Sequence, residues 1–397
     1  MPQKSTAKGR IIIESDDKGI RAALTIDGEP YEFIDSIAGK ESRIGSIYVG
    51  TVEAVTKSGF AFVDIGLERN AFLNLNDNKD AAIASTVKAG SLTAVQIVKD
   101  PYRDKGAAVT TKLTWPGRFF VIEKAQDAGG EINVSKKIQD APQRARLTRI
   151  VQGFFDQGKN DLAGKNIVIR TDAANAAPSS LEAEFKALVK AMKAAEELIS
   201  EANLESFDKT RLPLAVYSPY ESPCHKMAAE LMSGAAHISE ILVNSEAEHQ
   251  LLSKVYGSRG IKVILTSDSA FFTYNLSKAY ETTRHRLVHL PSGGHIVVDK
   301  TEACVVIDVN SGQYSGRKSL EDMAFKINKE AAREAARQLR LRNLGGAVLI
   351  DFIGMKDPEN IESLTRELKE ALAMDPAHTT VEGMTRLGFW ELTRKRR

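Results

Sequence analysis

Two aspartates in apolar surroundings are the residues of this sequence best suited to chemistry. Asp308 lies in the apolar run 304–309, and Asp351 directly follows the apolar run 347–350. A carboxylate is costly to bury without a partner. Oxygen-only ligands suit Mg²⁺ or Mn²⁺, which one or two carboxylates commonly hold together with a substrate phosphate. The pattern predicts a metal site able to activate water against a phosphodiester.

Asn310 adds an amide to this pair. In an extended strand alternate side chains share a face, so Asn310 and Asp308 are predicted to be neighbours on one face. The interpretation is that two carboxylates and an amide meet at one site. From spacing alone an alternative stays open, in which each aspartate only forms a strand-end turn or caps a helix.

The segment between the aspartates must bring them together. A capping box begins at Ser319, apolar residues recur at helical spacing over 320–339, and the Gly-Gly pair at 345–346 is predicted to stop the helix. Strand-helix-strand connections are right-handed and place their strands parallel. Asp308 and Asp351 are therefore predicted to converge at neighbouring strand ends.

Basic residues nearby have both a functional and a structural interpretation. The loop 312–319 is a near miss to a phosphate-binding P-loop, and Arg317 and Lys318 are candidate phosphate contacts. A plain connecting loop is an equally good interpretation. A stripe at helical spacing would track a nucleic-acid backbone, although such stripes are more often solvated faces: Arg333, Arg337 and Arg340.

The rest of the chain predicts a mixed architecture. Residues 11–35 contain two strand-like runs around an Asp27-Gly28 turn, which is a hairpin signal. Five short strand-like runs over 44–113 favour a small barrel, of which the OB-fold is one of the commonest. Residues 179–202 predict an amphipathic helix, whereas 214–283 and the last hundred residues alternate strands with helices, as in α/β layers.

Composition excludes several classes of protein. A chain of 397 residues exceeds the roughly 250–300 at which one core stops growing, so several domains are expected. No run approaches the ~20 apolar residues that span a bilayer, and the polar, basic start lacks a secretory signal, so no membrane association and a cytoplasmic location are expected. Only Cys224 and Cys304 occur, without zinc-finger spacing. The net charge of +2 leaves nucleic-acid binding to local clusters.

A long resemblance then becomes visible. The segment LPSGGHIVVDKTEACVVIDVNSG, followed by INKEAAREAARQLRLRNLGGAVLIDFIGM, resembles the signature of the deoxyribonuclease I-like subdomain of ribonucleases E and G. The likeness continues upstream through SIYVGTVEAV, FAFVDIGLERNAFLNL, DKGAAVTTK and IVIRT, and downstream through MTRLGFWELTRKR. It covers nearly the whole chain.

The resemblance implies an α/β multidomain fold. A ribonuclease H-like subdomain without catalytic activity of its own is expected from 1–39 and 214–283. Inserted in it are an OB-fold RNA-binding domain at 40–113 and a 5′-sensor region at 114–213. A deoxyribonuclease I-like catalytic subdomain is expected at 284–397.

The resemblance also implies roles for the catalytic and RNA-binding residues. Asp308 and Asp351 match the family's magnesium ligands, and Asn310 matches the residue that assists them at the scissile phosphate. In the barrel, the residues that match RNA-facing aromatics and a basic contact are Phe62, Phe72 and Lys105. The structural alternative for both phenylalanines is the barrel core, whereas stacking of a base on such a ring is worth roughly 1–3 kcal/mol.

The sensor region has its own matching residues. Arg170 and Thr171 match the pair that grips a 5′-monophosphate, and Gly117 and Val121 match residues that contribute backbone-level contacts. A guanidinium with a hydroxyl suits a terminal phosphate. Lysines at 136–137 stand where family members often carry arginines, so dependence on the 5′ end is less well supported by the resemblance than cleavage is.

The expected function is a magnesium-dependent endoribonuclease, with Mn²⁺ as the alternative metal. It would cleave single-stranded RNA in the processing of ribosomal RNA or the decay of messages, leaving 5′-phosphate and 3′-hydroxyl ends. The alternative is a non-catalytic RNA-binding protein with a vestigial nuclease site, and retention of Asp308, Asn310 and Asp351 argues against it. Nucleotide hydrolysis at the Gly312 loop and a zinc site at His285 and His289, in strand-like sequence, are disfavoured.

The sequence departs from the family at its end. Family members usually continue past MTRLGFWELTRKR into a CPxC segment that shares a zinc between protomers, and this sequence stops before it. A zinc-linked dimer is therefore not expected, while a homodimer of another kind stays open.

Overall fold

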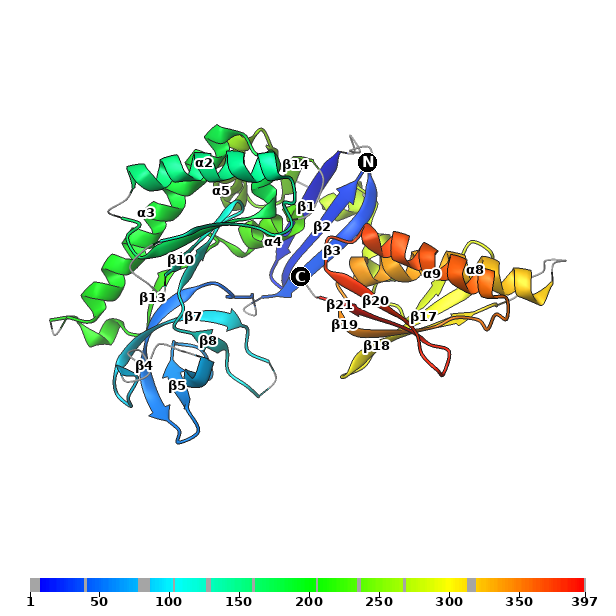
Figure 1. Ribbon diagram of the computed structural model, residues 1–397, viewed down its shortest axis with the longest axis horizontal. Helices are drawn as coiled ribbons and strands as arrows, with labels where there is room; N and C mark the ends of the chain where they lie inside the picture. Colours follow the sequence, from blue (N-terminus) through cyan, green and yellow to red (C-terminus); the bar gives the residue numbers. More distant parts are fainter. Residues whose placement is uncertain are drawn as a thin grey trace. The chain divides into compact units, whose positions relative to one another are not determined.

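The computed structural model describes most of the chain in two compact units. The described residues are 8–38, 41–77, 86–102, 104–125, 130–158, 161–204, 206–233, 237–266, 269–312 and 319–395. The first unit comprises Met1–Lys40 and Ser222–Arg397, and the second comprises Glu41–Glu221. Figure 1 shows the helices and strands of both units.

The first sheet of the first unit joins the start of the chain to a segment more than 200 residues later. Its strand order is β15-β14-β1-β2-β3. The predicted turn is confirmed, because Asp27 and Gly28 adopt φ of 51° and 88° between the second and third strands. The strands are β1 (Gly9–Asp16), β2 (Gly19–Ile26), β3 (Glu29–Ile37), β14 (Ile238–Val243) and β15 (Lys262–Leu265).

This sheet is covered on both faces, which explains the apolar triplet near the start of the chain. Ile11 and Ile13 pack with α4 and α5, whereas Ile12 faces the opposite way and packs with α6 and α7. Strands that are buried on both faces show continuous apolar runs. The covering helices are α4 (Pro223–Met232), α5 (Glu246–Tyr256), α6 (Ala270–Thr273) and α7 (Leu276–Thr282).

The second sheet of this unit has the order β16-β17-β18-β19-β21-β20. The pair β18 and β19 is parallel, as the strand-helix-strand pattern predicts, and the remaining pairs are antiparallel. The strands are β16 (Leu287–His289), β17 (His295–Lys300), β18 (Cys304–Asn310), β19 (Gly346–Asp351), β20 (Thr379–Met384) and β21 (Trp390–Arg394).

Two helices, α8 (Leu320–Leu341) and α9 (Pro358–Ala373), cover one face of this sheet (Figure 1). The predicted cap is confirmed, since the Ser319 hydroxyl accepts the Asp322 N–H at 3.1 Å. The predicted stop at Gly345 and Gly346 is wrong. The helix ends at Leu341 because Asn343, at φ 44°, takes the left-handed conformation that commonly ends helices.

The opposite side of this sheet, here called the open face, carries the alternate side chains. In β18 the buried residues are Val305, Ile307 and Val309, whereas Asp308 is exposed. The same alternation places Ile350 in the core and leaves Asp351 exposed. The core under α8 and α9 therefore fixes which side chains the open face presents.

The second unit begins with the predicted barrel. Five strands close on themselves, because β4 pairs with both β5 and β7. They are β4 (Ile47–Val55), β5 (Phe60–Asp64), β6 (Ala71–Asn74), β7 (Leu92–Lys99) and β8 (Ala108–Thr110). A further strand, β13 (Leu214–Tyr217), pairs with β4 at Ile47–Val49 and so joins the barrel sheet.

The remainder of this unit is a four-stranded sheet with two helices. Its strands, in the order β11-β12-β10-β9, are β9 (Thr114–Pro116), β10 (Phe120–Lys124), β11 (Ile132–Val134) and β12 (Lys165–Ile169). The predicted amphipathic helix is α3 (Pro178–Ala202). Sequence reasoning missed α2 (Ala141–Gln157), although the Asp140 cap and the buried Leu147 and Val151 are signals of a helix.

Across the ranges described, none of the helices is both long enough and apolar enough to cross a bilayer. Both cysteines are free, with Cys224 buried and Cys304 half-buried.

Candidate active site and RNA contacts

The open face brings the two predicted aspartates together. In the parallel register of β18 and β19, Asp308 is directly opposite Asp351. Neighbouring strands lie about 4.8 Å apart, and residues in register project from the same face. Both carboxylates are exposed. The predicted convergence of the two strand ends is confirmed.

Asn310 joins them as predicted. Its Nδ2 donates a hydrogen bond of 2.8 Å to Oδ2 of Asp308. One oxygen of Asp308 is thereby oriented by a neutral donor. Within the described part of the chain no hydrogen bond to the Asp351 carboxylate is found, so both of its oxygens can accept further ligands.

The donor set suits a hard divalent cation. Two carboxylates side by side repel each other, and a cation between them removes that repulsion. Among the described residues no three His, Cys, Asp or Glu side chains gather as a metal cage. Two carboxylates fit Mg²⁺ nevertheless, because this ion usually keeps several waters and takes further oxygens from a substrate phosphate.

A buried amide that sequence reasoning missed fixes the end of β19. Asn328 on α8 is fully buried, donates to the carbonyl of Ile353 at 2.7 Å and accepts the N–H of Ile353 at 2.9 Å. Phe352, which lies between Asp351 and Ile353 in the sequence, packs edge-on against Trp390, with ring centroids 5.1 Å apart. The backbone just after Asp351 is therefore held by contacts with α8 and with β21. The signal was a polar residue among the apolar positions of the helix.

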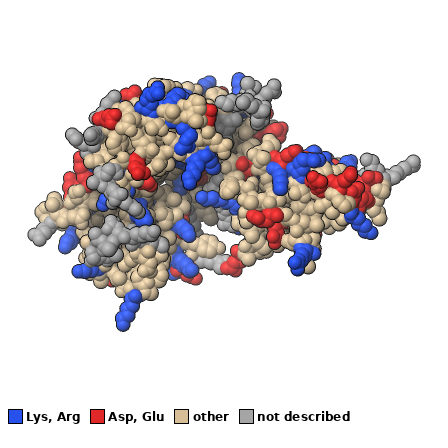
Figure 2. All heavy atoms as spheres, in the orientation of Figure 1, with Lys and Arg blue, Asp and Glu red and all other residues tan. Residues whose placement is uncertain are grey.

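The three arginines of the predicted stripe on α8 all have partners within their own unit. Arg333 pairs with Glu367 of α9, and Arg337 pairs with Glu334. Arg340 is 8% exposed, lies 4.1 Å from the ring of Tyr31 and donates to the Tyr31 carbonyl. Burial removes Arg340 from the predicted stripe, whereas Arg333 and Arg337 stay exposed or half-exposed in ion pairs within their own unit, so an RNA contact by these two residues stays a prediction. Figure 2 shows acidic and basic side chains interspersed over the surface of α8 and α9.

The candidate phosphate contacts Arg317 and Lys318 lie outside the described residues. His289 lies on β16, as the strand-like sequence predicts.

The two barrel aromatics lie outside the barrel core. Phe62 on β5 and Phe72 on β6 are directly opposite each other, with ring centroids 6.2 Å apart, and Phe62 is 37% exposed. The core interpretation is therefore wrong for this pair, since the core side chains of these strands are their neighbours Ala61, Val63, Ala71 and Leu73. Phe60, which sequence reasoning missed, lies 5.0 Å from Phe72 and extends the patch.

Lys105 lies on the loop that leads into the strand next to Phe72. It is exposed on the loop before β8, and Ala108 at the start of β8 pairs with Phe72. The turn that carries it is held by two backbone hydrogen bonds between Tyr102 and Lys105. Gly106 is required here, since a Cβ would lie 2.0 Å from the carbonyl oxygen of Asn70.

The predicted sensor residues gather at one edge of the second sheet of this unit. Nη1 of Arg170 donates to the carbonyl of Gly117 at 2.6 Å, and the Arg170 N–H donates to the carbonyl of Phe119. Val121 on β10 pairs with Pro116 of β9 and with Val168 of β12. These are the strands that lead into Gly117 and Arg170. The sensor edge is thus built from β9, β10 and the end of β12.

Thr171 has a hydroxyl partner that sequence reasoning missed. Its Oγ1 lies 3.2 Å from Oγ of Ser135, and both residues are exposed or half-exposed. Arg144 of α2 fixes this turn, because it donates to the carbonyls of Ser135 and Ile138. Hydroxyls and a guanidinium are donor types that suit a phosphate; here the two hydroxyls contact each other, and the Arg170 guanidinium contacts Gly117.

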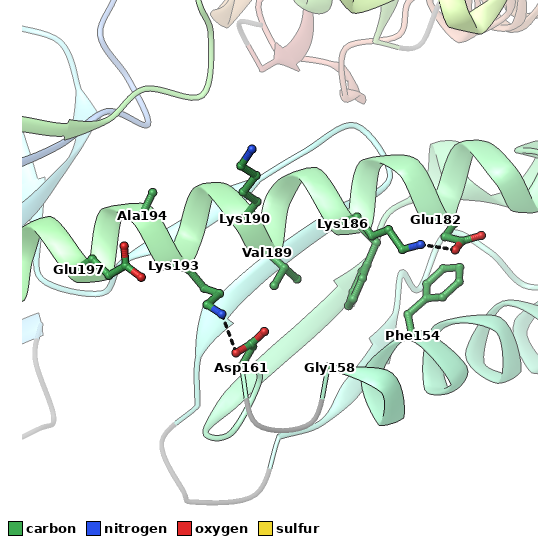
Figure 3. A pocket seen from close by; sticks show the side chains of 11 residues that line it. Phe154, Gly158, Asp161, Glu182, Lys186, Val189, Lys190, Lys193, Ala194 and Glu197 are labelled. Atoms are coloured by element: carbon green, nitrogen blue, oxygen red, sulfur yellow. Dashed lines mark hydrogen bonds and ion pairs between the residues drawn. The ribbon is translucent and has the colours of Figure 1, made fainter.

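A cavity of about 600 Å³ lies between α2 and α3 of the same unit (Figure 3). Phe154 and Val189 line it, and ion pairs of Lys186 with Glu182 and of Lys193 with Asp161 border it. None of the predicted site residues lines this cavity.

Comparison with known proteins gives one consistent family. The model of the ribonuclease E/G family matches residues 114–397. The chain is 31% identical over 395 residues to ribonuclease G of Haemophilus influenzae, which covers 95% of this chain and 77% of that protein. It is 30% identical over 377 residues to ribonuclease G of Escherichia coli K12, covering 89% and 73%. Ribonuclease E of a Nostoc species is 29% identical over 376 residues, covering 91% and 52%. The chain therefore belongs to the ribonuclease E/G family.

Proposed function

We propose that this chain cleaves single-stranded RNA with a magnesium ion held by Asp308 and Asp351. Family membership makes it an endoribonuclease that acts in RNA processing. The metal, the catalytic residues and the product ends are the proposal. One observation carries it: Asp308 and Asp351 are directly opposite each other on neighbouring strands of an open sheet face.

Each residue of the site has a distinct task. Asp308 and Asp351 would hold the ion, and Asn310 orients Asp308 through its hydrogen bond. A magnesium ion bound there supplies an activated water and offsets charge on the phosphate. Mn²⁺, which accepts the same oxygen ligands, is the alternative. Attack of water on phosphorus with the 3′ oxygen as leaving group yields 5′-phosphate and 3′-hydroxyl ends.

The aromatic patch of the barrel supports a single-stranded substrate. Phe62 and Phe72 present ring faces on which unpaired bases stack, and Lys105 adds a positive charge on the loop that leads into the strand next to Phe72. In a duplex the bases are stacked on each other and are not available to such rings. The substrate is therefore RNA with unpaired segments.

The sensor edge supports recognition of a 5′-monophosphate. Arg170 uses one N–H on the carbonyl of Gly117, which orients the guanidinium and leaves further donors for a phosphate. Thr171 adds a hydroxyl, and Gly117 and Val121 add backbone groups. This contact would favour RNA that already carries a processed 5′ end.

The subdomain assignments belong to the same proposal. The sheet β16–β21 with α8 and α9 is assigned as the deoxyribonuclease I-like subdomain, and the sheet of β1–β3, β14 and β15 as the ribonuclease H-like subdomain. The relatives are bacterial ribonucleases, which supports a cytoplasmic location for this chain.

The test is a pair of isosteric substitutions, Asp308→Asn and Asp351→Asn. Each keeps the shape of the side chain but removes a charge that holds the metal, so cleavage of an A/U-rich single-stranded RNA should fall at least about 100-fold. RNA binding, measured by electrophoretic shift, should survive. The matched control is Glu391→Gln, an exposed carboxylate on β21 of the same face, which should cleave at the wild-type rate.

Two outcomes contradict the proposal. Undiminished cleavage by either aspartate variant would remove the residue from the mechanism. A stable complex of wild-type protein with RNA, without new fragments in the presence of magnesium or manganese, would favour the alternative of an RNA-binding protein with a vestigial site. Product ends are read by ligation and by phosphatase treatment.

A further inference from the structure

Two histidines lie on the open face beside the candidate active site. His289 on β16 is directly opposite His295 on β17, and His295 is in turn directly opposite Asn310 on β18. The two imidazole rings are 6.4 Å apart between centroids at an interplanar angle of 64°. His289 is exposed and His295 is half-exposed, while their strand neighbours Val288 and Ile296 are buried in the core.

The next row of the same face is apolar up to the first aspartate. Leu287, which is 42% exposed, is directly opposite Val297, and Val297 is directly opposite Asp308. His289, His295, Leu287 and Val297 therefore form one continuous surface, here called the histidine platform. It ends at Asp308 in one row and at Asn310 in the other.

The platform is held rigidly from its buried side. The hairpin between β16 and β17 is fixed by Leu290, which is 5% exposed, and by the Ser292 N–H, which donates to Glu330 of α8 at 2.9 Å. Gly294 approaches the next strand so closely that a Cβ there would lie 2.9 Å from the carbonyl oxygen of Asn310. The histidine rings are thus presented by an ordered hairpin packed against β18.

The chemistry of the platform fits a nucleobase more closely than a phosphate. Unpaired bases stack on aromatic side chains, histidine included, and sheet faces that present such rings bind single-stranded RNA. The neighbouring cation of the hairpin, Arg286, is engaged by Asp299 and does not supply a free phosphate contact. An apolar, aromatic surface next to a pair of metal-binding carboxylates matches the two parts of one nucleotide, base and phosphate.

We propose that the histidine platform binds the base of the nucleotide that flanks the scissile phosphate, and so sets which phosphodiester lies over Asp308 and Asp351. The inference rests on the proposed cleavage site. It adds two residues, His289 and His295, whose task is to position the substrate. They determine where RNA is cut and how tightly the flanking nucleotide is held, whereas the aspartates determine whether it is cut.

The experiment compares alanine with phenylalanine at both histidines. His289→Ala with His295→Ala should raise KM for a short single-stranded RNA by about 5- to 100-fold, which corresponds to one lost base stack, and should shift the cleavage position. His289→Phe with His295→Phe keeps two ring faces and should restore both. The matched control is His378→Ala, an exposed histidine just before β20, which should behave as wild type.

Abasic substrates identify the base that is bound. Removing the base on one side of the scissile phosphate should weaken RNA binding by the wild-type protein as much as the alanine substitutions do. The abasic site and the substitutions together should weaken binding no further than either change alone. Removing a base several nucleotides away should leave the effect of the substitutions unchanged.

The same variants in an Asp308→Asn background separate the two proposals. There the platform is tested by equilibrium RNA affinity alone, without cleavage, and the alanine pair should again bind 5- to 100-fold more weakly. Unchanged KM, cleavage position and affinity would overturn the platform, as would phenylalanine variants as impaired as the alanine pair. The Asp308→Asn variant is compared with a wild-type protein that cleaves RNA. Absence of cleavage by the wild-type protein would overturn the proposed function instead.

Discussion

Asn310 is a neutral residue that orients its charged neighbour, Asp308. Its amide takes up one oxygen of Asp308 and so limits the directions in which this carboxylate can bind a cation. Asn328 plays a comparable part from below the sheet, where it holds the backbone just after Asp351. Positioning of the two aspartates therefore involves neutral amides, which would orient their partners without adding charge to the proposed metal site.

Replacing Asn310 by alanine should lower kcat without loss of RNA affinity. A hydrogen bond to a charged group contributes about 1.5–3 kcal/mol, so kcat should fall roughly 10- to 100-fold. Single-turnover cleavage and a binding titration separate the two quantities. Asn310→Asp is the informative companion, because it keeps the size but replaces the donor by a third carboxylate. A fall in affinity alone would contradict the assignment and indicate a contact to RNA.

Residues of the site differ in how far the sequence predicts them. The meeting of Asp308 and Asp351 is predictable because the strand-helix-strand pattern makes their strands parallel and adjacent, whereas the expected burial of the two carboxylates is wrong, since both are exposed. Phe60 and Ser135 are not predictable, because their place beside Phe72 and Thr171 depends on strand register and on a turn. Arg340 was misplaced for the same reason, since its burial against Tyr31 depends on contact between α8 and β3.

At the scale of elements, periodicity predicted types better than boundaries. The barrel strands and α8 follow from alternation and from the helical repeat. The end of α8 does not, because Asn343 rather than a glycine ends the helix. The strand β13 was predicted, but its pairing with β4 was not. A run of four apolar residues does not specify which strand it pairs with. Helix α2 was missed because its sequence contains many basic and polar residues and only a narrow stripe of apolar ones.

The packing of α9 on α8 offers a test at this scale. Glu367 of α9 accepts from Arg333 and pairs with Lys329, and the Arg333 guanidinium chiefly holds the pKa of the Glu367 carboxyl below its usual 4.5. A lowered pKa in the folded state stabilises the fold above pH 4.5, and this contribution is lost as the pH falls through the folded value. Glu367→Gln should therefore destabilise the protein by at most about 1 kcal/mol at pH 7.

Chemical denaturation at pH 7 and at decreasing pH measures this effect. The difference between wild type and Glu367→Gln should shrink as the pH falls below 4.5. Glu370→Gln, at an exposed position of the same helix, is the control and should show no such difference. A deficit that persists unchanged in acid would mean that packing, and not charge, accounts for the loss.

At the scale of the whole molecule, the two units differ in the number of separate stretches of sequence that form them. The first unit is built from two separate stretches of the chain, because β1 pairs with β2 on one side and with β14 on the other. The second unit is one continuous stretch whose ends meet: Ile47 of β4 pairs with Tyr217 of β13, and a Cβ on Gly45 would lie 3.0 Å from Pro219. The residues proposed to contact RNA in the barrel and at the sensor edge therefore all lie in this one continuous stretch.

Residues 41–221 alone should therefore fold, bind single-stranded RNA and leave it uncut. Thermal unfolding should be cooperative, and fluorescence anisotropy with an A/U-rich oligonucleotide should give an affinity insensitive to magnesium chelation. Phe62→Ala with Phe72→Ala should weaken binding by about 5- to 100-fold, as expected for a lost base stack. Equal binding by this variant would show that RNA does not use the aromatic patch.

A shorter segment tests why the insertion ends where it does. Residues 41–113 contain all five barrel strands but lack β13, and Ile47 would lose its neighbours in the core it shares with Phe120, Ile167 and Phe185. Exposure of apolar side chains at this junction costs stability in proportion to the area uncovered. The shorter segment should unfold at a lower temperature than 41–221 or fail to fold. If both unfold alike, β13 and the sensor sheet do not stabilise the barrel, and 221 is not the boundary that physical packing requires.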